Sequence, residues 1–266
     1  MNKNKGKLKQ YITDFWKYKD LLSLLVMKTI KLKYRRSILG YVWSVLNPLL
    51  IMVVMTLVFS SMFNRNIVNF PVYLFCGQLL FNFMNTSTHH ATKAITSSAA
   101  LLKKAYVPKY IFTLATVTSS AIEMVFSFGA LLIVMIATGH PFSWYNLLFP
   151  LVIIQLYLFC VGLGLFLAQA CVFFWDVEFI YNAVTTAWMY LTPIFYPMEA
   201  LPAAVAKLVS TFNPMYFYVT QFRSLIYAGQ LPSMHSVVGG CLYAAVMMLL
   251  GVWTFMKTED NFIMHI

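Results

Sequence analysis

Glu123 carries the only charge within a long apolar run, residues 110–138, and its carboxyl group is the first candidate for chemistry. An ionised carboxylate at the centre of a bilayer costs about 3 kcal/mol on insertion scales, so this side chain should face the interior of a helix bundle and have a partner. Gln155, Tyr157 and the same residue of a second copy are candidate partners, and the sequence does not choose among them. The sequence is compatible with two roles for Glu123, contact with a substrate and hydrogen-bonded packing between helices.

His89 and His90 are a second candidate, at the polar end of a run that begins near Pro71. A histidine pair can bind a metal or relay protons, but adjacent side chains on a helix point about 100° apart, which disfavours a shared ion. A polar channel wall or a helix contact is the alternative. The chain contains no G-x-x-x-x-G-K-[ST], H-E-x-x-H or G-x-S-x-G sequence, so we expect no bound cofactor or metal and no enzymatic activity of its own.

Lys33, Arg35 and Arg36 place three cations just before residues 37–64, which carry no charge. Cytoplasmic flanks of membrane proteins have an excess of Lys and Arg, so this boundary predicts a cytoplasmic N-terminus and a first span that runs outward. Tyr41 and Trp43 follow at the depth where aromatic rings lie among lipid headgroups.

The composition is that of a membrane protein with several spans. Of the 266 residues, 61% are hydrophobic and 10% are charged, and a soluble domain of this size cannot bury so much apolar surface. The net charge of +11 does not indicate nucleic-acid binding, because eleven of the nineteen Lys and Arg residues lie in the first 36 positions. The four cysteines form no C-x-x-C pair and are expected to be small apolar packing residues.

Six transmembrane helices are expected in an all-α integral membrane fold. The expected spans are 41–62, a second from about 71, 110–138, 147–174, a fifth from about 179, and 236–256. This arrangement leaves sixteen of the nineteen Lys and Arg residues inside and both termini cytoplasmic.

Two segments are expected to lie in the membrane without crossing it. Residues 11–30 place basic and apolar side chains on opposite sides of a helix, as in an interface helix, although a helix packed on protein fits the same pattern. Residues 196–230 are apolar but carry charges and prolines, so we expect two short re-entrant helices at the outer face. The chain thus divides into 1–36, a cytoplasmic arm with the interface helix, and 37–266, the transmembrane domain.

Aromatic residues make up 17% of the chain and cluster in WKY, VFFW, FYPM and MYFY. Aromatic belts at the two membrane interfaces explain such clusters, and so do rings that line a passage for sugars. The sequence does not separate these two interpretations.

Five stretches, in order, resemble the permease subunits of ABC-2-type transporters that export polysaccharides, including the O-antigen and teichoic acid (polyol phosphate) exporters. They are LKYRRSILGYVWSVLNPLL, AALLKKAYVPKYI, FFWDVEFIYNAV, TPIFYPMEALP and NPMYFYVTQFRSLIYAG. The likeness covers nearly the whole chain from about Asp20. It departs from the family at Trp175, where members often carry Arg.

The resemblance implies a pore subunit of a bacterial cytoplasmic (inner) membrane transporter. Two copies of this chain would form the pore, two copies of a separate ATPase that binds ATP and Mg²⁺ would drive it, and the cargo would be a polyprenyl-linked glycan. An ABC-2 exporter of small hydrophobic compounds is the alternative. A proton-coupled secondary transporter is a second one, but it would need intramembrane acids in both halves of the chain.

The resemblance also implies roles for particular residues. A coupling helix at about 98–108 would dock on the ATPase, although an ordinary basic loop fits the same residues. The residues near this contact would be Leu101, Leu102, Lys103, Lys104, Tyr106 and Pro108. The pyrophosphate of the cargo lipid would meet Lys33, Tyr34, Arg35 and Arg36, because cations suit phosphate and Arg binds it bidentately; membrane anchoring explains the same cations. The channel or gate would include Glu123, Tyr196, Tyr216, Tyr218 and Arg223.

Overall fold

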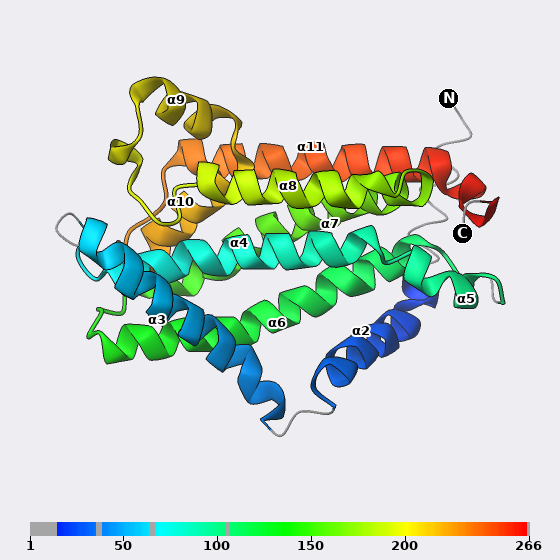
Figure 1. Ribbon diagram of the computed structural model, residues 1–266, viewed down its shortest axis with the longest axis horizontal. Helices are drawn as coiled ribbons and strands as arrows, with labels where there is room; N and C mark the ends of the chain where they lie inside the picture. Colours follow the sequence, from blue (N-terminus) through cyan, green and yellow to red (C-terminus); the bar gives the residue numbers. More distant parts are fainter. Residues whose placement is uncertain (1–14, 36–38, 64–66, 105–106, 265–266) are drawn as a thin grey trace.

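The computed structural model describes residues 15–35, 39–63, 67–104 and 107–264, and within these ranges the chain is helical with no strand. Its α-helices are α2 (Lys19–Tyr34), α3 (Trp43–Phe63), α4 (Phe70–Thr92), α5 (Ala99–Leu102), α6 (Tyr110–Ala137), α7 (Phe149–Phe173), α8 (Asp176–Leu191), α9 (Ala203–Phe212), α10 (Pro214–Ile226) and α11 (Met234–Thr258). Most long helices run lengthwise, whereas α2 and α3 are oblique (Figure 1). The predicted all-α fold is confirmed.

Four helical stretches among the described residues are long and apolar enough to cross a membrane. They are Gly40–Phe59, Tyr110–Ala137, Trp144–Phe173 and Met234–Phe262, and they match the first, third, fourth and sixth expected spans. The other two expected spans are helices as well, but α4 is polar along one side and α8 has only 16 residues. A membrane crossing by α4 and α8 therefore stays a prediction.

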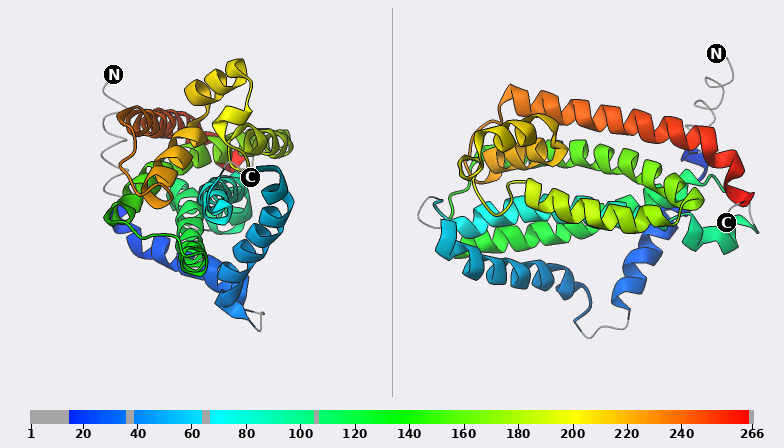
Figure 2. Two further views of the ribbon diagram at one scale, coloured as in Figure 1. Left: turned by 90° about the vertical axis from the view of Figure 1, so that its left-hand side faces the viewer. Right: turned by 45° about the horizontal axis from the view of Figure 1, so that its top comes forward.

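α7 and α11 form the centre of a tightly packed unit, to which α10 also belongs; we call α7, α10 and α11 the scaffold. A methyl group on Gly251 would lie 2.0 Å from the carbonyl oxygen of Gly162, so the two helix backbones are in direct contact. Small residues permit this close approach between membrane helices. Figure 2 shows α11 on one side of the bundle and α2 with α3 on the opposite side.

α2 packs along α6 by its apolar face. Val26 and Ile30 are buried against Ala115 of α6. The amphipathic pattern thus correctly predicted a helix, and α6 provides the protein surface that its apolar side covers. A position of α2 in the membrane interface stays a prediction.

The two ends of the bundle differ in character. One end carries α5 and the C-terminal 3₁₀ helix Glu259–Met264, and α9 lies at the other end (Figure 1). At the first end the Lys109 ammonium donates to the carbonyl oxygen of Glu259 and lies 5.2 Å from the centre of the Phe262 ring. Burial lowers the pKa of Lys109, and the nearby acids Glu259 and Asp260 oppose that shift.

At the other end, residues 196–230 form two short helices as expected: α9 lies on the surface, and α10 packs against α4, α7 and α11. Their re-entry into the membrane stays a prediction.

Candidate functional site

α4 carries a row of polar side chains at four-residue spacing: Gln78, Asn82, Thr86 and His90. This spacing places them along one side of the helix. Asn82 and His90 are exposed, and Thr86 is half-buried. Polar side chains on a membrane helix need protein or water beside them, so this side of α4 is not suited to lipid.

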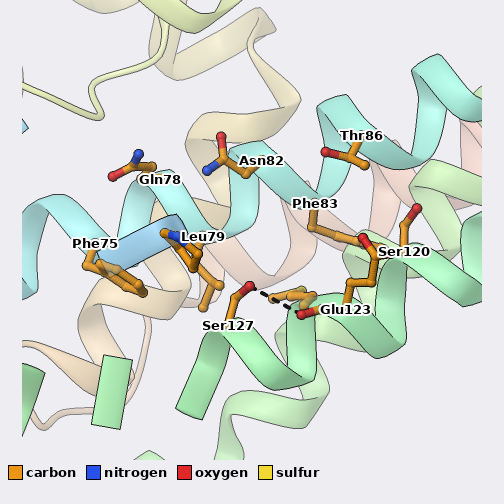
Figure 3. A pocket seen from close by; sticks show the side chains of 11 residues that line it. Phe75, Gln78, Leu79, Asn82, Phe83, Thr86, Ser120, Glu123 and Ser127 are labelled. Carbon is orange, nitrogen blue, oxygen red and sulfur yellow. Dashed lines mark hydrogen bonds between the residues drawn. The ribbon is translucent and has the colours of Figure 1, made fainter. Parts of the chain in front are cut away.

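α6 carries a second row, made of Thr116, Ser120, Glu123 and Ser127. Figure 3 shows most of both rows side by side along their helices. We call the pair of rows the polar seam. It joins two helices that lie next to each other in the bundle.

The neutral pocket is a cavity of about 80 Å³ at the part of the seam that α3 covers. Its lining residues are Pro48, Phe75, Gln78, Leu79, Asn82, Phe83, Thr86, Ser120, Glu123, Met124 and Ser127 (Figure 3). Gln78 is buried, and its Oε1 accepts no hydrogen bond from any described residue. The cavity has room for several water molecules, which supply such missing partners in proteins.

The basic pocket is a cavity of about 550 Å³ that continues the seam toward α5. Its lining residues are Leu25, Lys28, Thr29, Leu32, His89, His90, Lys93, Ala94, Ser97, Ser98, Phe112, Ala115, Thr116 and Glu178. The Lys93 ammonium lies 2.6 Å from a carboxylate oxygen of Glu178, which brings α8 to the rim. The volume lies within the range of about 300–1,000 Å³ that is usual for ligand pockets.

Glu123 pairs with Lys33, at the junction of the two pockets. The Lys33 ammonium donates to the Glu123 carboxylate at 2.7 Å, and the Glu123 side chain is 17% exposed. Neither partner that we had considered within the chain bonds to this acid. Gln155 instead accepts a hydrogen bond from Gln221, and the Tyr157 hydroxyl pairs with Thr118.

The packing around Glu123 shows which part of α3 lies beside it. Ser127, one turn further along α6, donates to the carbonyl oxygen of Ser44, so the start of α3 lies beside Glu123. α6 has 28 residues, about 42 Å at 1.5 Å per residue, and extends well past this level toward α5. Glu123 thus lies level with the beginning of α3, and its depth in a membrane stays a prediction.

The two histidines face different surroundings. His89 Nε2 lies 3.1 Å from the hydroxyl of Thr185 on α8, and its ring packs on Tyr181. His90 is exposed and faces Lys33 and Glu123. Among the described residues, no three His, Cys, Asp or Glu side chains gather as a metal site requires. His90 therefore belongs to the polar seam, whereas His89 contacts α8.

The residues expected near the ATPase lie at the end that carries α5. Leu101, Lys103 and Lys104 are exposed there, whereas Leu102 and Pro108 are half-buried. The helix itself is short, Ala99–Leu102, and does not extend over the whole of 98–108. Tyr106 lies outside the described residues, as do Arg36 and the side chain of Tyr34. Arg35 is exposed just after α2.

The other candidate gate residues lie among α8, α10 and α11. The hydroxyl of Tyr218 is buried and donates to the carbonyl oxygen of Gly240 at 3.0 Å. Tyr196 is half-buried and donates to the carbonyl oxygen of Tyr190, and Tyr216 packs edge-on against Phe217. The Tyr218 bond joins α10 to α11, whereas the other two contacts are local, and none of the three tyrosines lines the neutral or the basic pocket.

Arg223 joins three segments of the chain. Its guanidinium donates to the carbonyl oxygens of Tyr73 (3.2 Å), Pro193 (2.6 Å) and Ile194 (2.8 Å), and it stacks on the Tyr73 ring at 3.5 Å. Its donors are directed at backbone oxygens and not at the polar seam, which assigns it to the scaffold.

Sequence analysis assigned no functional role to Lys28, Lys93, Glu178 or Thr185. A signal for the α4 side of the site was present, because Gln78, Asn82, Thr86 and His90 repeat every four residues. No comparable signal pointed to α2 or α8, whose residues reach the basic pocket only through folding.

Within the described residues, a helical bundle with four long apolar stretches is the architecture of a multi-pass membrane protein. The sequence profile of the ABC-2 type transporter family matches residues 20–227, and the chain belongs to this family. It is 29% identical over 252 residues to the O-antigen export system permease protein RfbA of Myxococcus xanthus, covering 94% of this chain and 97% of the relative. A Klebsiella pneumoniae protein of the same name is 26% identical over 214 residues (80% and 82%). The capsule polysaccharide export inner-membrane protein CtrC of Neisseria meningitidis is 25% identical over 240 residues (88% and 89%).

Proposed function

We propose that this chain is the permease subunit of an ATP-driven exporter that moves a lipid-linked polysaccharide or teichoic acid across the bacterial cytoplasmic membrane. The polar face of α4 carries the proposal, because exposed Asn82 and His90 on a membrane helix require a watery path or a partner. The relatives named for O-antigen and capsule export support a polysaccharide as cargo.

The path forms between two copies of the chain. α3 and α8 both contact α4 (Figure 2) and leave most of their own surface uncovered. α8 exposes Asn182, Thr186 and Tyr190, again at four-residue spacing. A second copy placed against α3 and α8 would cover their apolar residues and enclose the polar ones, since symmetric dimers bury the same surface on both subunits.

A separate ATPase, present in two copies, supplies the energy for transport by hydrolysing ATP. The exposed side chains of Leu101, Lys103 and Lys104 offer one apolar and two basic contacts at the end of the bundle. Lys33 and Arg35, close to the start of the first span, suit the phosphate of an incoming cargo lipid by charge. Cargo would therefore enter near the α2–α3 connection, on the side of the membrane where ATP is bound.

The test is ATP hydrolysis by this chain co-purified with its ATPase and reconstituted in phosphatidylcholine nanodiscs. Polyprenyl-linked glycans should raise the rate, whereas the free glycan and phosphatidylglycerol should not. Stimulation by small hydrophobic compounds alone would favour the alternative exporter. Transport that follows a proton gradient without ATP would overturn the proposal.

A further inference from the structure

We infer that the basic pocket binds the phosphate group of a membrane lipid, and, on the basis of the proposed function, that this group is the diphosphate of the cargo lipid. The inference concerns other residues than Lys33, Arg35 and Arg36: Lys28 and Thr29 of α2, His90 of α4, Lys93 directly after α4, and Glu178 of α8. These side chains come from three helices and meet at one cavity.

The donors in the pocket have the chemistry that phosphate requires. Lys28 and Lys93 supply the ammonium groups around this space. The hydroxyl groups of Thr29, Ser97 and Thr116 also line it; each donates to a backbone carbonyl oxygen of its own segment and would have to rotate to donate to a phosphate. Charge-assisted hydrogen bonds to phosphate oxygens are about twice as strong as neutral ones. Basic pockets between membrane helices on the cytoplasmic side are also the usual sites for phosphate headgroups.

The position of the pocket suits a lipid ligand. One wall is the face of α2 that carries Leu25 and Leu32, and the opposite wall is the basic end of α4. Lys33, at the end of α2, forms the ion pair with Glu123, which lines the neutral pocket. A phosphate in the basic pocket would have the neutral part of the seam ahead of it, where uncharged sugar hydroxyls find amide and hydroxyl partners.

Glu178 forms an ion pair with Lys93 at the rim of the pocket. Their atoms lie 2.6 Å apart, and the ammonium side chain is 63% exposed, so it is accessible from the cavity. A phosphate would take the place of this carboxylate on Lys93. Removal of the negative charge at Glu178 should therefore increase phosphate affinity, an effect that damage to the fold does not produce.

The experiment measures binding of farnesyl diphosphate, phosphatidylglycerol and inorganic pyrophosphate to the full-length chain in phosphatidylcholine nanodiscs. Lys28→Gln and Lys93→Gln should each weaken farnesyl diphosphate binding about tenfold, the expected loss for one charged hydrogen bond. Glu178→Gln should strengthen it several-fold. Lys31→Gln is the matched control, because Lys31 is exposed on the same helix but does not line the pocket.

The arms of this experiment separate the possible outcomes. Binding of farnesyl diphosphate and inorganic pyrophosphate with the same variant pattern supports the site. If phosphatidylglycerol binds as tightly as farnesyl diphosphate, the ligand of the pocket is not specifically the diphosphate of the cargo lipid. A loss with Lys31→Gln equal to that with Lys28→Gln, or weaker binding with Glu178→Gln, would overturn the pocket itself. None of these binding results depends on ATP hydrolysis. The phosphate site can therefore be refuted without refuting the exporter function, and the exporter function can be refuted without refuting the site.

Discussion

α7 and α11 meet along their backbones, whereas α4 and α6 carry the polar seam beside an apolar contact. In the scaffold, Gly162 of α7 and Gly251 of α11 have no side chain, so the two helix backbones touch at these positions. At the polar seam, hydroxyl, amide and charged groups leave two cavities between the helices. Well-packed interiors tolerate no added volume, while a wet polar boundary can change partners at low cost. The comparison indicates that the scaffold is the rigid side and the seam the side that can move.

The largest effect is expected from the scaffold residue Arg223. Arg223→Met leaves the carbonyl oxygens of Pro193 and Ile194 without the donor that they have now. Unsatisfied buried groups cost about 1–3 kcal/mol each, so we expect a loss of about 3 kcal/mol in the free energy of unfolding. Thermal unfolding of the purified chain in detergent, followed by tryptophan fluorescence, measures it. Lys207→Met, at an exposed position of α9, is the control and should change little; equal losses in the two variants would remove Arg223 from the scaffold.

The next effect is expected at the glycine contact. Gly251→Ala places a methyl group against the Gly162 backbone, which no side-chain rotation can relieve. Overpacking of this kind costs about 1–3 kcal/mol, and the same unfolding measurement detects it. Gly129→Ala is the matched control, because nothing lies within 4 Å of the added carbon there. Because alanine is favoured over glycine inside a helix, Gly129→Ala should raise the free energy of unfolding by about 0.5–1 kcal/mol. A neutral result for Gly251→Ala would contradict the assignment of rigidity to this side.

The smallest effect on stability is expected at the seam. Lys33→Gln and Glu123→Gln break an ion pair whose lysine is 46% exposed. Such pairs contribute about 0–1 kcal/mol, so each variant and the double variant should unfold within about 1 kcal/mol of the parent. A double-mutant cycle on the unfolding midpoint gives the coupling energy between the two residues. A coupling as large as the Gly251→Ala loss would mean that the seam is as rigid as the scaffold.

Much of the fold was open to prediction, because hydropathy and charge are read along consecutive residues. The four apolar spans and the helical character of α2 follow from such patterns. The family motifs likewise pointed to the transporter class that the profile match confirms. The candidate site was predicted less well. Gln155 and Tyr157 were reasonable partners for Glu123 by type, but both bond elsewhere. Arg223 and Tyr218 bond to backbone oxygens, which their residue types did not predict, and their role as gate residues stays a prediction.

The sequence by itself determined that this is an all-helical membrane protein with cations gathered near one end of its spans. Those properties depend on the transfer of consecutive residues from water to lipid, which each segment undergoes largely on its own. Only the tertiary structure decided that Lys33 meets Glu123, 90 positions away, and that α2, α4 and α8 together surround a basic pocket. Contacts of this kind depend on the rotation and tilt of each helix, and packing between helices sets these where periodicity does not.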